Sequence, residues 1–325
     1  MNDCMKISVI AIFYNSEQYI RKCLDSILSQ KDVDFEVIAV NDASTDSTID
    51  ILREYSSQFP NIKIINHSVN KGIAAARNSG LENISGDCFY LIDGDDYLTS
   101  DIALRSLSEH YDDSVDWVQG SYLKCDENGA KIGEISFQNK WYSDFKTICD
   151  CFVELDFVYT HNKLINAKHR SLKFNVGCYH EDRMWNVMIF NQLSKIVSIS
   201  TPTYNYVIRS GQTSRKSRSQ RLYLDSGMSL MRMMSDVPEC WGSIRDTFQI
   251  VDIEKTLYLW EHDRIYRKRV LNELKVLNKP QINTENFPRF TRLIHSMITV
   301  EIPDIFINII SKSYLKVMTH MGKAV

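Results

Sequence analysis

The first hundred residues alternate strictly between two kinds of segment, and this alternation limits the fold more than any other feature of the chain. Short continuous apolar runs predict buried strands, and longer stretches with apolar residues at helical spacing predict helices. A strand-helix alternation of this kind implies a parallel sheet with right-handed crossovers, so the sequence predicts an α/β fold. The predicted strands cover residues 6–13, 35–41, 62–67 and 88–93, and the predicted helices cover 16–30, 48–59 and 72–84.

Three of these strands run directly into polar clusters. Tyr14 and Asn15 follow the first strand, residues 41–46 end the second, and Asp93 to Asp96 end the fourth. In open parallel sheets, ligands bind beyond the carboxyl ends of the strands. We therefore expect the three clusters to line one crevice.

The strict alternation stops after about residue 112. Residues 115–124, 131–137 and 196–209 resemble strands, with Pro202 as a break or an edge position in the last of them. Residues 142–154 and a segment beginning near His180 have helical spacing, and the pattern beyond about residue 218 is mainly helical. We predict a mostly parallel α/β domain over 1–215 and a helical C-terminal region over 216–325, divided in the polar stretch SGQTSRKSRSQR.

Composition excludes several classes of protein. The net charge of −3 provides no basic field for nucleic acid. The eight cysteines form no CxxC pair, so we expect a reduced, cytoplasmic chain. The N-terminus lacks the features of a signal peptide, and no run reaches the roughly 18 apolar residues of a membrane span.

Asp93 and Asp95 form the strongest candidate for a metal site. Carboxylates one residue apart can present hard oxygen ligands to Mg²⁺ or Mn²⁺. An EF-hand does not fit, because its sixth and twelfth loop positions would be Leu98 and Leu104. A solvated acidic turn remains the alternative. The position at the end of a buried strand favours the metal.

Asp42 and Arg77 are candidates for ligand binding. Residues 44–47 suit the capping of a helix, whereas Asp42 lies at the strand end and could accept a hydrogen bond from a nucleobase. Arg77 lies in an alanine-rich helical segment. It is either exposed to solvent or packed closely enough by its small neighbours to hold its guanidinium near the crevice.

Two further candidates lie later in the chain. Glu181 and Asp182 occupy the first turn of a predicted helix, where acidic residues suit the helix dipole but could also act as a general base. Arg209 leaves a strand for a Ser-Gly loop that could close over a diphosphate. The alternative is a basic linker.

These motifs occur in one particular order. They are SVIAIFYNSEQYI, NDASTDST, NKGIAAARN, LIDGDDYL, HED, and YVIR followed by TS. In this series the N-terminal 215 or so residues resemble the GT-A fold glycosyltransferases of family 2, which are inverting and use nucleotide sugars. One departure is Ile12, where the family often has proline or threonine.

For the donor, the resemblance implies a nucleotide sugar, most often UDP-linked. Tyr14 would flank the base, and Asp42 would hydrogen-bond it with Arg77 nearby. Asp93 would contact the ribose and the metal shell, and Asp95 would ligate Mn²⁺ or Mg²⁺.

For the transfer step, the resemblance implies that Asp182 of the Glu181-Asp182 pair deprotonates the acceptor. Arg209, together with Ser214, would neutralise the leaving nucleoside diphosphate. Asp96 is expected to have a capping or supporting role.

The predicted function is transfer of a sugar from a UDP-linked donor to a saccharide or lipid-linked saccharide in a bacterial surface glycan, such as capsule or O-antigen. The alternatives are a nucleotidyltransferase, which would want a glycine-rich loop after the first strand, and a non-catalytic nucleotide-sugar-binding protein. Residues 301–325 have an apolar helical face. This face could contact the inner surface of the cell membrane, pack on the catalytic domain, or form a homodimer.

Overall fold

The computed structural model describes residues 5–143, 155, 159–177, 181–190 and 192–209. The chain separates into two units, Met1–Lys216 and Ser217–Val325, and every described residue lies in the first. The predicted helix over 142–154 and the predicted helical region over 216–325 therefore lie almost entirely outside the described residues.

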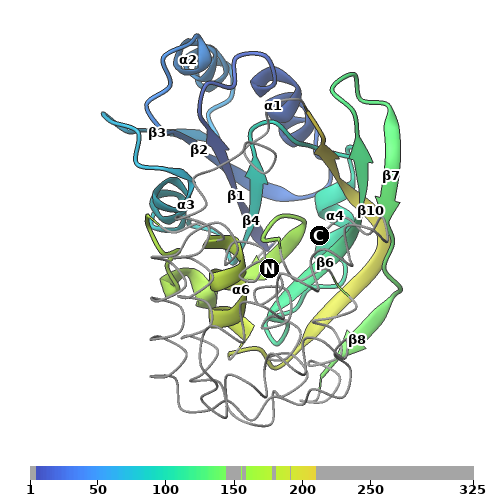
Figure 1. Cartoon of the computed structure of the whole chain (residues 1–325). Coiled ribbons are helices and arrows are strands. Elements are labelled where there is room, and N and C mark those ends of the chain that lie inside the picture. The colour runs from blue at the N-terminus through green and yellow to red at the C-terminus, as the bar shows by residue number, and fades with distance from the viewer. Residues whose placement is uncertain (1–4, 144–154, 156–158, 178–180, 191, 210–325) are drawn as a thin grey trace, which may run out of the picture. The chain divides into compact units, whose positions relative to one another are not determined.

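The first half has the predicted alternation of strands and helices (Figure 1). Its four strands pair in parallel in the order β3-β2-β1-β4. Nearly every residue of β1 is buried, as the unbroken apolar run predicts. The elements are β1 (Lys6–Phe13), α1 (Ile20–Leu28), β2 (Asp34–Asn41), α2 (Thr48–Gln58), β3 (Ile62–Asn66), α3 (Ile73–Leu81) and β4 (Cys88–Asp93).

The second half contains shorter elements, several of which the sequence pattern did not predict. The predicted strands over 115–124 and 131–137 are present as β6 and β7, and Pro202 marks a register shift inside one long strand, β10. The helix predicted to begin near His180 is present as α6, whereas the other short elements carry too few residues to show a period. The elements are β5 (Tyr97–Leu98), α4 (Ala103–Ser108), β6 (Trp117–Cys125), β7 (Lys131–Ile135), β8 (Lys140–Tyr142), β9 (Lys163–Asn166), η1 (Ala167–Ser171), α6 (Glu181–Phe190) and β10 (Ile196–Val207).

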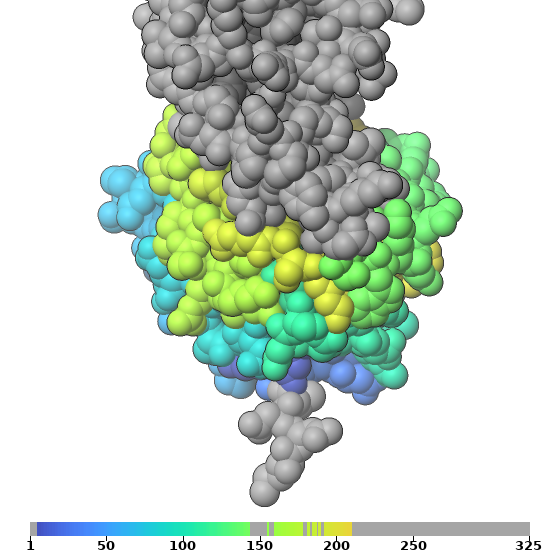
Figure 2. Space-filling model, turned by 90° about the horizontal axis from the view of Figure 1, so that it is seen from below, coloured from blue at the N-terminus to red at the C-terminus, as the bar shows by residue number. Residues whose placement is uncertain are grey.

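Ten strands of the described residues form one mixed sheet. Strand β9 lies between β4 and β6 and is antiparallel to both, whereas β6 and β10 are parallel. In the space-filling view, β10 (yellow) lies between residues 159–190 (yellow-green) and the green surface of β7 and β8 (Figure 2). The expected α/β fold class, with helices flanking the sheet, is confirmed for this part of the chain, but the sheet is mixed and not mostly parallel, because β5, β7, β8 and β9 pair antiparallel with their neighbours.

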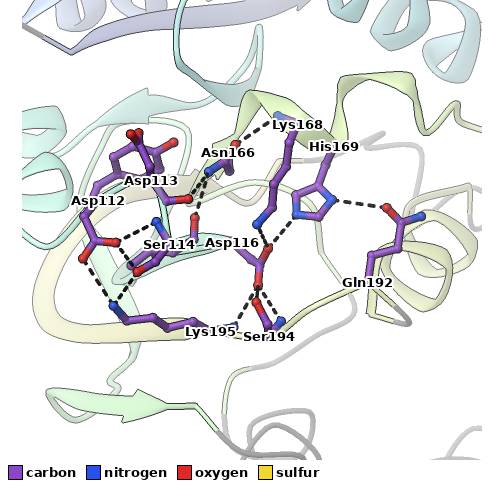
Figure 3. A network of polar contacts seen from close by, with 12 residues as sticks. Asp112, Asp113, Ser114, Asp116, Asn166, Lys168, His169, Gln192, Ser194 and Lys195 are labelled. Carbon is purple, nitrogen blue, oxygen red and sulfur yellow. Dashed lines mark hydrogen bonds and ion pairs between the residues drawn. The ribbon is translucent and has the colours of Figure 1, made fainter. Parts of the chain in front are cut away.

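A buried carboxylate ties together the edge of the sheet at which β6 and β10 begin (Figure 3). Asp116 accepts hydrogen bonds from Nε2 of His169 at 2.9 Å and from the backbone N–H of Lys195 at 2.8 Å. Nζ of Lys168 lies 2.6 Å from the same carboxylate. These contacts join β6, η1 and β10 at the edge opposite the carboxyl ends of β1 and β4.

No helix in the described ranges is long and apolar enough to cross a bilayer. The described cysteines, Cys23, Cys88 and Cys125, are free and buried.

Candidate functional site

The carboxyl ends of β1, β2 and β4 meet, as their parallel order requires. The backbone N–H of Asp42 donates to the carbonyl of Phe13 at 2.9 Å, and the N–H of Gly94 donates to the carbonyl of Ile12 at 2.9 Å. A Cβ atom at Gly94 would lie only 2.4 Å from Cδ1 of Phe13. Glycine therefore allows the acidic turn to lie against β1, and the three predicted clusters line one region.

Asp42 is buried at the end of β2 and holds the start of α3. Its Oδ1 accepts from the N–H of Lys71 at 2.9 Å, and its Oδ2 accepts from the N–H of Gly72 at 2.8 Å. Nδ1 of His67 lies 2.7 Å from Oδ1, and Nε2 of the same ring lies 2.9 Å from Oγ of Ser79. Sequence reasoning missed His67, whose only signal is its place directly after β3. Contact of Asp42 with a nucleobase stays a prediction.

Arg77 is buried and joins three elements of the site. Its Nη2 lies 3.1 Å from Oδ1 of Asp93 on β4, and its Nη1 lies 2.9 Å from Oε1 of Glu181 on α6. The guanidinium lies 5.4 Å from the ring centre of Phe174, within cation–π range. Burial lowers the pKa of Arg77, but the carboxylates, Asp93 and Glu181 foremost, outweigh it and raise the pKa above its ordinary value. Of the two alternatives that the sequence leaves open for Arg77, exposure to solvent and close packing near the crevice, the structure therefore shows the second.

Arg209 forms an ion pair with Asp95 of the acidic turn. Nε of Arg209 donates to Oδ2 of Asp95 at 2.8 Å, and the guanidinium lies 4.8 Å from the ring centre of Tyr19. Burial and the charge of Asp93 raise the pKa of Asp95, and Arg209 partly offsets them. Arg209 is thus in direct contact with the acidic motif.

Asp96 faces away from this pair and into the sheet. Its Oδ2 accepts from the hydroxyl of Tyr204 at 2.5 Å, and its Oδ1 accepts from the backbone N–H of Val207 at 2.8 Å. Burial, together with the charges of Asp95 and Asp93, raises the pKa of Asp96 well above its ordinary value. These contacts suit the supporting role expected for Asp96, because they anchor the acidic turn to β10.

The remaining predicted residues have different surroundings. Tyr14 is 50% exposed at the end of β1 and could lie against a ligand. Asp182 follows Glu181 in the first turn of α6 and is close enough to Arg77 to raise its pKa. Ser214 lies outside the described residues.

The residues present fit a divalent cation in part. Asp93 and Asp95 supply the hard oxygen atoms that Mn²⁺ and Mg²⁺ prefer, and their side chains remain 30% and 16% exposed. In the described part of the chain, no group of three or more acidic, histidine or cysteine side chains could hold a metal. Two carboxylates suffice only where a substrate or water supplies the other ligands, which is usual for Mg²⁺.

Three comparisons with known proteins bear on this site. Residues 8–171 match the family model described as Glycosyl transferase family 2. Glycosyltransferase GlyA of Streptococcus pneumoniae is 32% identical over 221 residues, which cover 65% of this chain and 32% of GlyA. The poly(ribitol-phosphate) beta-glucosyltransferase of Bacillus spizizenii is 41% identical over 104 residues, or 31% of this chain and 16% of that protein. The chain thus matches about a third or less of either relative.

Among solved structures, the 1–349 fragment of S. aureus TarS in complex with UDP-GlcNAc is similar with a TM-score of 0.72. The match has 19% sequence identity and covers 96% of this chain and 92% of the fragment. At this identity the similarity establishes the fold alone.

Proposed function

The chain belongs to glycosyl transferase family 2, and from this premise we propose that it transfers a sugar, with inversion, from a UDP-linked donor to a saccharide hydroxyl of a bacterial surface glycan. The observation that carries the proposal is Arg77, which brings the acidic turn of β4 and the acidic start of α6 into one site through Asp93 and Glu181. A glycosyl transfer needs both segments. The acidic turn would hold the donor phosphates through a metal ion, and the start of α6 would accept the proton of the acceptor hydroxyl.

Displacement at the anomeric carbon builds negative charge on the leaving diphosphate and positive charge on the sugar. Arg209 would stabilise the leaving diphosphate by exchanging its contact with Asp95 for contacts with phosphate oxygens. A Mn²⁺ or Mg²⁺ ion held by Asp93 and Asp95 would supply further positive charge to the diphosphate when bound. Tyr14 and Asp42 would hold the base, and Ser214 would assist Arg209.

Asp182 would take the proton of the attacking hydroxyl. Asp182 is the residue that the motif assigns as the base, and Glu181 beside it forms an ion pair with Arg77. Because the base and the leaving group lie on opposite faces of the sugar in a single displacement, the product would have inverted configuration.

The names of the relatives support the choice of substrates. GlyA is named a glycosyltransferase, and the Bacillus relative is named for poly(ribitol phosphate), a polymer of sugar alcohol and phosphate. The TarS fragment was solved with UDP-GlcNAc. We therefore place a UDP-sugar as the donor and a surface polymer or its lipid-linked precursor as the acceptor.

The experiment is a comparison of the intact protein with its Asp182→Asn variant on a panel of UDP-sugars with Mn²⁺. Calorimetry would measure donor binding, and UDP release would measure turnover. We expect Asp182→Asn to bind the donor as the wild type does and to lose at least about 100-fold in turnover. Asp50→Asn, at an exposed position of α2, is the matched control. Undiminished turnover in Asp182→Asn would exclude Asp182 as the base, and failure of the wild type to bind any nucleotide sugar would refute the proposed function.

A further inference from the structure

Three buried histidines occur in the described part of the chain, and one of them differs from the other two. Each ring nitrogen of His67 and His169 lies within 3.4 Å of a side-chain oxygen. His161 is only 7% exposed, yet among the described contacts neither of its ring nitrogens has a hydrogen-bond partner. The described polar atoms that are fully enclosed and lack a partner do not include these nitrogens, so they lie where water or a ligand can reach them.

His161 lies at the carboxyl edge of the sheet, next to the acidic turn. Strand β9 pairs antiparallel with β4, and Leu164 lies opposite Tyr90. His161 lies two residues before the start of β9, on the side from which this strand approaches the carboxyl end of β4. The charges of Asp93 and Arg77 both act on the pKa of His161, which agrees with this position.

Aromatic packing fixes the orientation of the imidazole. Its ring stacks on Tyr204 at a centroid distance of 4.6 Å and on Tyr159 at 4.9 Å, and the ring of Tyr122 meets it edge-on at 5.5 Å. Tyr204 is itself held by its hydrogen bond to Asp96. The imidazole is therefore held in place by stacking, and a ligand that bonds it would cost little side-chain entropy.

The ring nitrogens of His161 define what it can bind. Its stacking partners are uncharged tyrosine rings. A neutral imidazole has one nitrogen that donates a hydrogen bond and one that accepts. A neutral imidazole near a carboxylate does not attract a phosphate. Arg209 and a metal ion, which are positively charged, would do so. A hydroxyl group, which both donates and accepts, matches the imidazole.

We propose that His161 hydrogen-bonds a hydroxyl of the sugar at the transfer site and thereby helps to determine which sugar the protein accepts. This inference rests on the proposed function, and it assigns a role to a side chain near Asp93 and Arg77, whose charges act on it. The hydroxyl belongs either to the donor sugar or to the acceptor, and the chemistry is the same in both cases.

The test compares His161→Phe, which keeps a flat ring for stacking but has no nitrogen, with His161→Gln, which restores a donor and an acceptor. His110→Phe is the matched control, because its ring lies just beyond the end of α4, away from the site, and its described hydrogen bond is to the carbonyl of Ser106. The probes are UDP, UDP-GlcNAc and UDP-glucose with Mn²⁺, followed by calorimetry. Hydrolysis of each UDP-sugar and its transfer to a panel of p-nitrophenyl glycosides are measured in parallel.

If the donor sugar is recognised, His161→Phe will bind UDP as the wild type does and bind a UDP-sugar roughly threefold to tenfold more weakly. His161→Gln will recover part of the loss. If the acceptor is recognised, UDP-sugar binding and hydrolysis will stay unchanged, and the KM for the glycoside will rise by a similar factor. Should the phenylalanine variant fail to fold, His161→Leu, which also lacks ring nitrogens, takes its place.

Two results would overturn the inference while leaving the proposed function intact. In the first, His161→Phe matches the wild type in UDP-sugar affinity and in the KM for the glycoside. In the second, it binds UDP as weakly as it binds UDP-sugars, which indicates a structural role. Failure of the wild-type protein to bind any of the UDP-sugars would refute the proposed function, and this inference with it.

Discussion

Nε and Nη2 of Arg209 lie 2.8 and 2.5 Å from the same oxygen, Oδ2, of Asp95. The sequence assigns these two residues to a metal ion and to a diphosphate, and in the fold they pair with each other across 114 positions of the chain. The pair keeps one carboxylate oxygen engaged in a site that is mostly shielded from water. A phosphate that takes up these two nitrogens of Arg209 must therefore displace Oδ2 of Asp95, whereas a metal ion could bind the other oxygen of the carboxylate.

Replacing Arg209 should reduce turnover strongly. We expect Arg209→Ala to lower kcat by about 10²–10³, because it removes a positive charge from the leaving diphosphate. The kcat of Arg209→Lys should lie between that of the wild type and that of Arg209→Ala, because an ammonium group keeps the charge but cannot form a bidentate contact. Initial rates of UDP release measure the effect. Arg105→Ala, at an exposed ion pair on α4, serves as control, and a wild-type rate in Arg209→Ala would contradict the assignment.

Removing the charge of Arg77 should destabilise the fold. Arg77→Met keeps much of the side-chain volume but leaves Asp93 and Glu181 without their shared cation. We expect a loss of about 3 kcal/mol in the free energy of unfolding, measured with urea, because largely buried carboxylates are left uncompensated. In the control Arg21→Met, an exposed pair is lost and no measurable change is expected. Equal stability of the two variants would show that the Arg77 contacts contribute nothing.

Gly94 should not tolerate a side chain. A Cβ atom there would lie 2.4 Å from Cδ1 of Phe13 and 2.6 Å from the carbonyl oxygen of Ile12, so either the acidic turn or β1 must move. We expect Gly94→Ala to lose about 1–3 kcal/mol of stability, and to bind UDP-sugars less tightly because Asp93 and Asp95 shift with the turn.

Thermal and urea unfolding, together with calorimetry, check this prediction. Gly133→Ala is the control, because the nearest atom to its added Cβ would be 3.7 Å away, an ordinary contact. If Gly94→Ala unfolds at the same urea concentration as Gly133→Ala, the close approach of the turn to β1 is not needed for stability.

Asp116 should make stability depend on pH. Burial would raise its pKa, but hydrogen bonds, from His169 first and then from Lys168 and the backbone, outweigh burial and lower the pKa below the ordinary 3.8. The stabilisation is therefore complete well above pH 3.8 and is lost as the pH falls further, toward the folded-state pKa. Urea unfolding of the wild type and of Asp116→Asn from pH 7 to pH 3 measures the contribution.

We expect Asp116→Asn to be less stable than the wild type at pH 7, because the buried partners lose a charged acceptor. The difference in unfolding free energy should shrink in the acid range, where the carboxylate of the unfolded wild-type chain takes up a proton while that of the folded protein stays charged. A difference that stays constant down to pH 3 would contradict the lowered pKa.

The sequence by itself determined the elements of the first half and the edge of the sheet where the site lies. Strand and helix are encoded in periods of a few residues, and a parallel sheet brings the carboxyl ends of its strands together. The positions of Asp42 and Asp93 at one edge follow from that rule alone. Short elements such as β5 and β9 carry too few residues to show a period, and they were found only in the structure.

The tertiary structure decided which side chains meet. Arg77 contacts Asp93, 16 residues away, and Glu181, 104 residues away, and no local pattern connects the three. Among the described contacts the ring of His161 has no hydrogen bond while that of His169 has two, although each is a single histidine in the sequence. The physical reason is that burial and hydrogen bonding depend on what packs around a side chain through space. Sequence spacing does not record this, and only the folded sheet supplies it.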